Sequence, residues 1–598
     1  MVDIEPKNAA SPVLRKYWRT LGSVLTGEFL TAREEQFFLV LAIFIGIFSG
    51  LAVVCFRIGI DSARLVLLGS SLKPSFPRVV LIPAAIGLLI AILVIRFFPR
   101  ARGSGVNQTK GALYIYDGYI AGDTVIGKFI TSALAIGSGQ SLGPEDPSLQ
   151  IGAGLASFLG RRLKLSRERL RLIAPVGAAA GLAAAFNAPI TAVLFVIEEV
   201  VGRWSAGILG AIVLSAISSV VVERWFLGDA PLFRIPQYHL VHPGELGAYA
   251  VLGVVGGFAS LAFVKTIGYL RPRAKELPAW TQYFQPAVAG AIIGVIGIWF
   301  PQVMGAGYDY MDQAMHGQFP WKLLLILAGL KIVATCLSFS SGTPGGLFAP
   351  TLFIGAMIGG GVGMFERAMF PHLVVPVGAY ALVGMGTLFA GILRAPMTSV
   401  FMILEVSGNY SIILPVIISN AIAYFISRRF EPIPIFDLLS RQDGLDLPSL
   451  EEERELEVLR VENAMQPRPA NVLSGFEMLA DARRVAQDSG QKYFLVRMAS
   501  GNWAGITKEA LMDGNTNDQV PLATIAAHML PQLYPDHPLD HALRMMGEWP
   551  LLPVVHRADH SNLLGILTLE DVIRAYRASG HEAPGNEEGS SLFVPRSS

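Results

Sequence analysis

The sequence predicts an α-helical membrane domain built from two copies of one unit, followed by a soluble α/β domain. Its 598 residues are 52% hydrophobic and only 16% charged, whereas about a quarter of the residues in a soluble domain are charged. The apolar part contains short sequences that occur twice. From about residue 458 the composition becomes that of an ordinary soluble protein, with alternating β and α patterns.

Eight stretches contain no Asp, Glu, Lys or Arg, and most approach the ~20 residues that a helix needs to cross a bilayer. They are residues 37–56, 79–95, 172–197, 205–222, 246–264, 332–365, 373–393 and 411–427. One such stretch alone is compatible with a buried helix of a soluble protein. Eight in one chain favour membrane-spanning helices in a lipid bilayer.

The apolar half repeats itself. PSLQIGA at 147–153 matches PTLFIGA at 350–356, and APITAVLFVIE at 188–198 matches APMTSVFMILE at 395–405. The first pair begins 203 residues apart and the second pair 207 residues apart. Two pairs at nearly one spacing indicate a duplicated unit of ~200 residues.

The predicted copies are residues about 34–225 and 245–440, and both contain a break. Pro189 and Pro396 follow residues that a proline pushes out of helical geometry. A chain interrupted at membrane depth is tolerated where protein or a water-filled cavity satisfies the backbone. The pattern therefore predicts a transporter whose substrate site lies where broken helices meet.

The chain divides into five predicted segments. A cytoplasmic amphipathic lead (1–33) precedes the membrane domain (34–440), and a charged linker (441–457) leads to the soluble part (458–579) and a disordered tail (580–598). Lys and Arg beside the first and last spans predict that both ends of the chain are cytoplasmic.

Three Gly-rich elements interrupt the apolar sequence: GSGVN (103–107), GPEDP (143–147) and GTPGGLFAP (342–350). In each, small residues precede a segment able to start a helix, whose N-terminus carries unpaired N–H donors and partial positive charge. Several such ends together would hold an anion without the tight binding of a full countercharge. The alternative is that these glycines only allow helices to pack closely.

These elements, with GLAAAFNAPITAVLFVIEE at 181–199, together resemble the signatures of the CLC family of chloride channels and chloride/proton antiporters. The resemblance covers roughly residues 35–440. It implies an inverted repeat with broken helices, a homodimer in the inner (plasma) membrane, and an anion pathway in each subunit. It also implies exchange of chloride or a similar monovalent anion for protons, with no required cofactor.

The resemblance assigns the central anion to the hydroxyl of Ser104, to Gly105, and to the backbone N–H groups of Leu347 and Phe348. Phe436 stands where the family has a tyrosine. Because phenylalanine has no hydroxyl donor, we expect Phe436 to act at most as a steric gate.

Glu145 matches the gating glutamate of the family and is expected to accept protons from outside. A carboxylate beside an anion site competes with the anion for the same helix N-termini and stops competing once protonated. The alternative is an ordinary helix N-cap. The family pattern is G-R/K-E-G-P, whereas this chain has Pro144 and Asp146 around Glu145, so a second carboxylate stands at the anion entrance.

Three further positions are assigned by the resemblance. Glu199 is expected to pass protons to Glu145 from inside, although Glu198 and Glu199 are also compatible with an ordinary interfacial acidic pair. Lys128 would raise the local positive potential or snorkel to an interface. Asn107 stands where the common GSGIP form has proline, so the preferred anion stays open.

The soluble part also repeats. YFLV followed by GIT (493–507) parallels LLPVV followed by GILT (551–568), and the order resembles a tandem pair of CBS domains. In such domains Thr568 and Asp571 would contact an adenine nucleotide. The first copy has Lys508 and Leu511 at the matching places, so the alternative is a scaffold that stabilises a dimer.

The sequence thus predicts a chloride/proton antiporter rather than an enzyme, with a passive chloride channel as the closest alternative. The net charge of +1 says little about partners, and no basic patch with interleaved aromatic residues points to nucleic acid. CBS pairs also follow intramembrane zinc proteases and magnesium channels. No H-E-x-x-H motif occurs, the spans have too few carboxylates for magnesium, and no metal site is expected.

Overall fold

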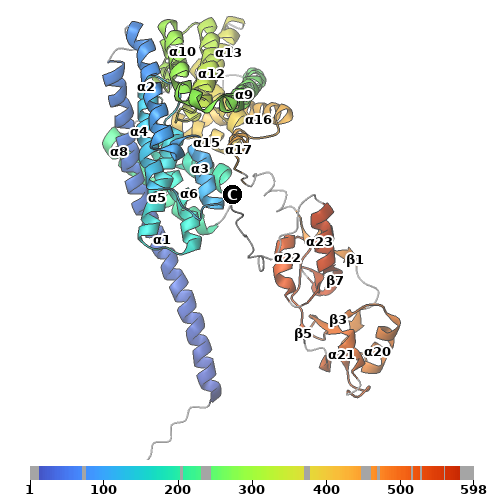
Figure 1. Cartoon of the computed structure of the whole chain (residues 1–598). Helices are drawn as coiled ribbons and strands as arrows, with labels where there is room; N and C mark the ends of the chain where they lie inside the picture. The colour runs from blue at the N-terminus through green and yellow to red at the C-terminus, as the bar shows by residue number, and fades with distance from the viewer. Residues whose placement is uncertain are drawn as a thin grey trace, which may run out of the picture. The chain divides into compact units, whose positions relative to one another are not determined.

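The structure of the chain is a computed structural model (Figure 1). It describes residues 12–69, 76–202, 206–229, 233, 244–369, 377–445, 447, 459–467, 472–513, 516–525, 528–547, 549–557 and 559–578, without the side chains of 12–35, 167–168 and 206–207. The predicted amphipathic face of 1–33, most of the predicted linker 441–457 and the predicted tail 580–598 lie outside this description. The chain forms two compact units, Met1–Pro448 and Ser449–Ser598.

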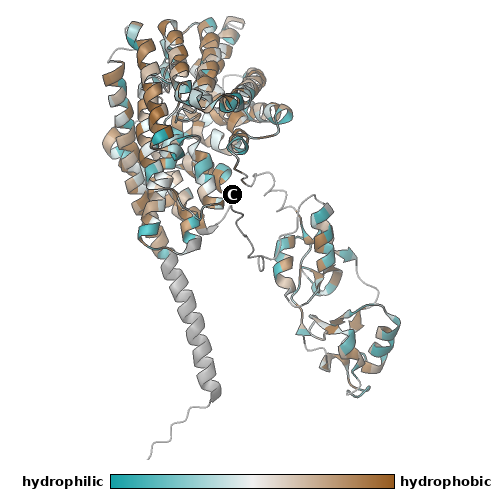
Figure 2. Cartoon of the chain, viewed as in Figure 1, coloured by the Kyte–Doolittle hydropathy of each residue, from teal (hydrophilic) through white to brown (hydrophobic). Residues whose placement is uncertain are grey.

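The first unit is helical, and Figure 2 shows apolar residues along most of its helices. Its first half contains α1 (Pro12–Leu67), α2 (Phe76–Arg96), η1 (Pro99–Ala101), α3 (Gly105–Tyr114), α4 (Gly122–Gly137), α5 (Glu145–Arg162), α6 (Arg167–Phe186), α7 (Pro189–Phe195), the π-helical turn η2 (Val196–Val201) and α8 (Ala206–Leu227). Its second half contains α9 (Glu245–Glu276), η3 (Ala279–Tyr283), α10 (Gln285–Trp299), η4 (Pro301–Val303), α11 (Tyr308–Met315), α12 (Trp321–Ser340), α13 (Phe348–Met369), α14 (Val377–Leu393), α15 (Pro396–Ser407), η5 (Tyr410–Ile412), α16 (Ile413–Phe430) and α17 (Ile435–Gln442).

Among the described residues, eight helices are long and apolar enough to cross a membrane. They do not coincide with all of the uncharged stretches. The stretch 332–365 is divided between the end of α12, a Gly-rich loop and the start of α13. Three further apolar helices are shorter: Gln285–Trp299, Val377–Leu393 and Pro396–Ser407.

The two halves pack in the same way. In the first half α5 packs on α6, and in the second α13 packs on α14. A β-carbon on Gly152 would lie 2.2 Å from the carbonyl oxygen of Gly177, and one on Gly355 would lie 2.3 Å from that of Gly384. Equivalent small residues therefore bring the backbones of both helix pairs into contact.

The predicted breaks are present in both halves. Helix α6 ends at Phe186 before α7, and α14 ends at Leu393 before α15. Asn187 and Arg394, one in each break, adopt left-handed backbone conformations with φ of 55° and 59°. The prolines that follow occupy the first helical position, where the missing N–H costs nothing.

The halves meet at Gly143 and Gly346, which are 203 residues apart in the sequence. The Gly143 N–H donates to the Gly346 carbonyl at 2.9 Å, and the Gly346 N–H donates back at 2.8 Å. Equivalent residues of the two copies thus pair with each other across an antiparallel bridge. The pairing places the starts of α5 and α13, two residues further on, beside one local twofold axis.

The second unit contains two small sheets. The first has the order β2 (Leu473–Ser474), β3 (Tyr493–Arg497), β4 (Trp503–Thr507) and β5 (His528–Met529), and the second has the order β1 (Gln466–Pro467), β7 (Asp559–Thr568) and β6 (Leu551–His556). Strands β2 and β3 are parallel and all other pairs are antiparallel. The helical segments are α19 (Val461–Ala464), α20 (Leu479–Asp488), α21 (Lys508–Met512), η6 (Leu522–Thr524), α22 (Leu539–Met546) and α23 (Leu569–Ala578).

Each sheet has its own apolar core, with one core around Phe494 and Ile506 and the other around Leu552 and Leu567. In both copies two antiparallel strands lead into a helix, α21 or α23. The predicted strand–strand–helix repeat is therefore present.

Candidate anion-binding site

Three helices begin close together in the first unit: α3, α5 and α13. The bridge between Gly143 and Gly346 joins the starts of α5 and α13. The side chain of Asp146, in the first turn of α5, joins α5 to the start of α3. All three beginnings are buried, and each lies in one of the Gly-rich elements predicted to form the site.

A carboxylate occupies the N-terminus of α3. The Ser104 hydroxyl donates to Asp146 Oδ2 at 3.0 Å, and the N–H groups of Gly105 and Val106 donate to Asp146 Oδ1 at 2.5 and 3.1 Å. Asp146 has no exposed surface. Ser104 and Gly105, predicted to bind the anion, thus bind a side chain of the chain itself in this structure.

Glu145 lies at the N-terminus of α13. The Ala349 N–H donates to Glu145 Oε2 at 3.3 Å, and the Tyr308 hydroxyl donates to Oε1. Glu145 is the first residue of α5, after the N-cap residue Pro144, and its side chain reaches across to the start of α13. Leu347 and Phe348, whose N–H groups were predicted to face the anion, precede Ala349 and are fully buried.

Aromatic rings surround Phe348. The ring centroids of Phe195, Phe389, Phe186 and Phe436 lie 5.0, 5.7, 6.0 and 6.2 Å from that of Phe348. Phe436 itself is fully buried. The apolar cluster lowers the local dielectric around the start of α13, which strengthens every interaction of a charge there.

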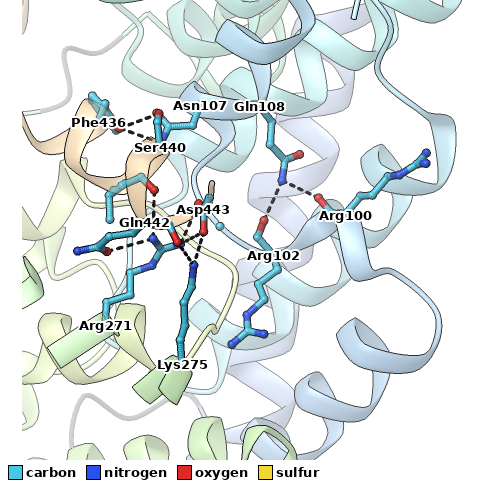
Figure 3. Close-up of polar contacts among 12 residues, drawn as sticks. Arg100, Arg102, Asn107, Gln108, Arg271, Lys275, Phe436, Ser440, Gln442 and Asp443 are labelled. Carbon is cyan, nitrogen blue, oxygen red and sulfur yellow. Dashed lines mark hydrogen bonds and ion pairs between the residues drawn. The ribbon is translucent and has the colours of Figure 1, made fainter. Parts of the chain in front are cut away.

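Asn107 connects α3 to α17. Its side-chain amide donates to the Phe436 carbonyl at 2.9 Å, and the Ser440 hydroxyl donates to the same oxygen at 2.9 Å (Figure 3). The predicted selectivity residue therefore holds the segment that carries Phe436.

Glu199 is buried in an ion-pair cluster. The Lys110 ammonium lies 2.5 Å from Glu199 Oε1 and 3.4 Å from Asp437 Oδ1, and all three side chains are almost fully buried. Glu199 belongs to the π-helical turn η2, a local irregularity often found at functional sites. Lys110 from α3 and Asp437 from α17 converge on it from distant parts of the sequence.

Glu198 has a different role from Glu199. It accepts hydrogen bonds from the Thr398 N–H at 2.9 Å and the Thr398 hydroxyl at 2.7 Å, at the start of α15. Its repeat partner Glu405 accepts from the Thr191 N–H at 2.7 Å and hydroxyl at 2.6 Å, at the start of α7. The two residues cap each other's helices, so Glu198 and Glu199 do not act as one interfacial pair.

Lys128 is buried and does not snorkel. Its ammonium donates to the carbonyls of Ala101 and Gly103, just before α3, at 3.2 and 2.6 Å. Lys331, 203 residues later, donates in the same way to Val303 and Gly305 before α11, at 2.9 and 2.6 Å. Both lysines support the loop that precedes a short helix of their own half.

Two cavities reach the site. A cavity of about 320 Å³ reaches Pro144, Ser148 and Tyr308, beside Glu145, and is lined by Arg57 and Arg64. Asp61 and Asp309 line the same wall, and Arg64 pairs with Asp309, so the wall presents both charges.

A second cavity of about 480 Å³ reaches Ser104 and Asn107 and is lined by Arg102, Arg271 and Lys275. Figure 3 shows that Asp443 pairs with Arg271 and Lys275 in this wall. Burial would raise the pKa of Asp443, but these two cations outweigh it and hold the pKa below its ordinary value.

The predicted nucleotide residues of the second unit bind each other. The Thr568 hydroxyl donates to Asp571 Oδ2 at 2.5 Å, and Gln466 donates to Asp571 Oδ1 at 2.7 Å. Asp571 is buried and lies at the start of α23. In this structure the pair acts as a helix cap.

Within the described residues, no cluster of three or more His, Cys, Asp or Glu could hold a metal ion. Cys55 and Cys336 carry free thiols in this structure.

Four side chains of the site were not predicted in the roles that the structure gives them: Lys110, Tyr308, Asp437, and Asp146 on the start of α3. A lysine in the uncharged part of α3 and an aspartate next to Phe436 were the available signals. Only the fold shows that they meet.

The chain is similar to known membrane proteins. The sequence model of the family described as voltage gated chloride channel matches residues 86–428, and that of the CBS domain matches residues 524–578. The H(+)/Cl(-) exchange transporter ClcA of Salmonella paratyphi B and that of Salmonella newport are each 31% identical over 426 residues, which cover 68% of this chain and 89% of theirs.

Solved structures resemble the fold. A slow cyanobacterial Cl−/H+ antiporter superposes with a TM-score of 0.63 at 24% identity, covering 68% of this chain and 98% of its own. A eukaryotic CLC transporter gives a TM-score of 0.60 at 21% identity, covering 89% of this chain and 97% of its own.

Proposed function

Because the chain belongs to the voltage gated chloride channel family, or CLC family, we propose that it exchanges chloride or a similar monovalent anion for protons across a membrane. Membership confirms the resemblance drawn from the Gly-rich motifs. The observation that carries the proposal is the position of Glu145. Its fully buried carboxylate contacts the first turn of α13, where an anion would also bind, and lies next to a cavity that reaches Pro144 and Tyr308.

The physical basis of exchange is competition for one set of donors. A carboxylate and a chloride ion carry the same charge, so the Ala349 N–H and the partial positive charge of the helix start can hold either of them. Protonation removes the charge of Glu145 and with it the attraction between the carboxylate and the start of α13. The proton thus leaves the helix with the carboxyl group while the anion takes its place, which couples the two movements in opposite directions.

The inner proton pathway of the proposal uses Glu199. A buried acid in a π-helical turn, next to the lysine of α3, can hold a proton in transit only if Lys110 and Asp437 shift with it. Lys110 is therefore a positioning residue for Glu199.

A reconstitution experiment tests the proposal. The purified full chain is placed in liposomes, a chloride gradient is applied, and the external pH is followed with an electrode. Uphill proton movement is expected, and Glu145→Gln should abolish it while chloride still moves. Glu199→Gln should also stop protons. Glu276→Gln, which changes an exposed acid at the end of α9, is the matched control and should leave coupling unchanged.

One observation favours a passive channel. The Lys110 ammonium beside Glu199 balances the charge of its carboxylate and favours the ionised form over the protonated form that would relay protons. If chloride flows down its gradient in the same liposomes and no proton moves against its own, the channel interpretation replaces exchange.

The proposed setting is the inner (plasma) membrane, with both ends of the chain in the cytoplasm and two copies forming a dimer. Span-length helices and the family support a multi-span membrane protein. The basic ends Arg428 and Arg429 of α16 support a cytoplasmic C-terminal side. Single-molecule photobleaching of the labelled chain in liposomes should show two steps, and one step would contradict the dimer.

Adenine nucleotide binding by the second unit is a finer proposal. The CBS domain match over residues 524–578 supports it, whereas the contact between Thr568 and Asp571 opposes it because a nucleotide would have to replace that cap. Calorimetry with ATP and the full chain tests it. We expect a binding heat that saturates with the natural chain and is lost with Thr568→Ala. If the natural chain gives no heat, the scaffold alternative remains.

A further inference from the structure

We propose that Asp146 is a tethered anion, which occupies the anion seat on α3 and must leave before a transported anion can bind there. The inference rests on the proposed function only in taking a monovalent anion as the substrate. It adds a second carboxylate to the one assigned to gating. Asp146 would set how tightly this chain holds its anion, whereas Glu145 would couple the anion to protons.

The contacts of Asp146 are those that a bound anion would make. Its two oxygens accept from the Ser104 hydroxyl and from the N–H groups of Gly105 and Val106, which are the first free donors of α3. Ser104 and Gly105 are also residues at which the family resemblance places the central anion. A carboxylate and a halide compete directly for such donors.

The charge of Asp146 is balanced as that of a bound anion would be. Among the described residues no Lys or Arg forms an ion pair with it within 4.0 Å. The buried Lys128 donates its ammonium hydrogens to the carbonyls of Ala101 and Gly103, and acts on Asp146 only from a distance. Neutral donors thus make the direct contacts with the carboxylate, and Lys128 adds an attraction over a longer distance that an anion bound at the same place would share.

The space around Asp146 fits it closely. A β-carbon on Gly105 would lie 2.6 Å from Asp146 Oδ1, and one on Gly346 would lie 2.8 Å from the Asp146 β-carbon. The carboxylate fills the position directly in front of the first two N–H groups of α3. Either Asp146 or a mobile anion can occupy the start of α3, but not both.

Two neighbouring carboxylates thus occupy two different helix starts. Both residues belong to the first turn of α5. The carboxylate of Glu145 contacts the start of α13, and that of Asp146 contacts the start of α3. The family pattern has glycine at the position of Asp146, so in that pattern the seat on α3 has no carboxylate beside it. Phe436 adds to the effect because it lacks the hydroxyl donor of the tyrosine that it replaces.

The expected consequence is weak anion binding in the natural chain. A competitor that is part of the chain raises the apparent Kd by the inverse of the fraction of time for which the seat is vacant. If the seat is vacant for about a tenth of the time, the apparent affinity falls about tenfold. A chain without this carboxylate should regain the lost affinity for the anion.

The test is chloride binding to the full chain in detergent, measured by titration calorimetry against an isethionate background. The natural chain is compared with Asp146→Gly, which follows the family pattern, and with Asp146→Asn, which keeps the shape but removes the charge. Asp312→Asn, a change on the outer part of α11, is the matched control for net charge. Size-exclusion profiles before and after titration identify variants that do not fold.

Asp146→Gly should bind chloride about tenfold more tightly than the natural chain, Asp146→Asn should also bind more tightly, and Asp312→Asn should match the natural chain. If Asp146 only ties α5 to α3, neither variant will gain affinity, and that result would overturn the proposal. If Asp146→Gly does not fold, Asp146→Asn decides in the same way. Tight chloride binding by the natural chain refutes the tethered anion alone, and chloride binding by no variant refutes the proposed substrate as well.

Discussion

Lys110 holds two buried carboxylates, and its removal should destabilise the membrane unit strongly. In Lys110→Met, Glu199 and Asp437 remain buried without their cation. At an effective dielectric constant of about 20, the contacts at 2.5 and 3.4 Å correspond to about 7 and about 5 kcal/mol of Coulomb attraction. The cost of burying the lysine offsets most of this attraction, so the net loss should be about 3–5 kcal/mol.

The assay is unfolding in mixed micelles with increasing denaturant, followed by far-UV circular dichroism. Lys265→Met, which changes an exposed lysine of α9, is the matched control and should be close to neutral. The triple variant Lys110→Met, Glu199→Gln, Asp437→Asn should recover part of the loss, because no buried charge is left unpaired. Two results would contradict this prediction: Lys110→Met unfolds at the same denaturant concentration as the natural chain, or the triple variant is no more stable than Lys110→Met.

Two further changes test the site and its frame. Tyr308→Phe removes a donor to Glu145 Oε1 and should loosen the gate. A hydrogen bond to a charged group is worth about 1.5–3 kcal/mol, so chloride efflux from liposomes should rise about ten- to a hundredfold. An unchanged efflux would show that this contact does not hold the gate. Glu405→Gln weakens the charge-assisted cap at the start of α7 and should cost about 1–2 kcal/mol in micelle unfolding while leaving the proton-to-chloride ratio unchanged; a changed ratio would place Glu405 in the ion pathway.

The helix breaks and the duplicated arrangement of the membrane unit were largely predictable, because they depend on short local motifs that occur in both halves. The breaks at Pro189 and Pro396 follow from the geometry that proline imposes on its neighbour. The common spacing of the repeated motifs correctly places the starts of α5 and α13 in equivalent positions. The uncharged stretch 332–365 was less informative, because lack of charge does not distinguish a span from a buried Gly-rich loop.

The contents of the site were less predictable, because they depend on contacts between residues far apart in the sequence. Lys110 meets Asp437 across 327 positions, and neither residue has a local pattern that points to the other. The sequence draws attention to Asp146 as a departure from a motif. Only the folded chain shows that its carboxylate turns toward α3 while that of Glu145 turns toward α13.

The most direct test of the central claim is anomalous scattering from crystals of the full chain grown in bromide. We predict a bromide peak beside the Ala349 N–H in Glu145→Gln and none there in the natural chain, where the carboxylate occupies that donor. Bromide at this donor with Glu145 still in place would contradict the claim that carboxylate and anion exclude each other. Absence of bromide from the starts of both α13 and α3 in the variant would contradict the claim that these helices hold the anion.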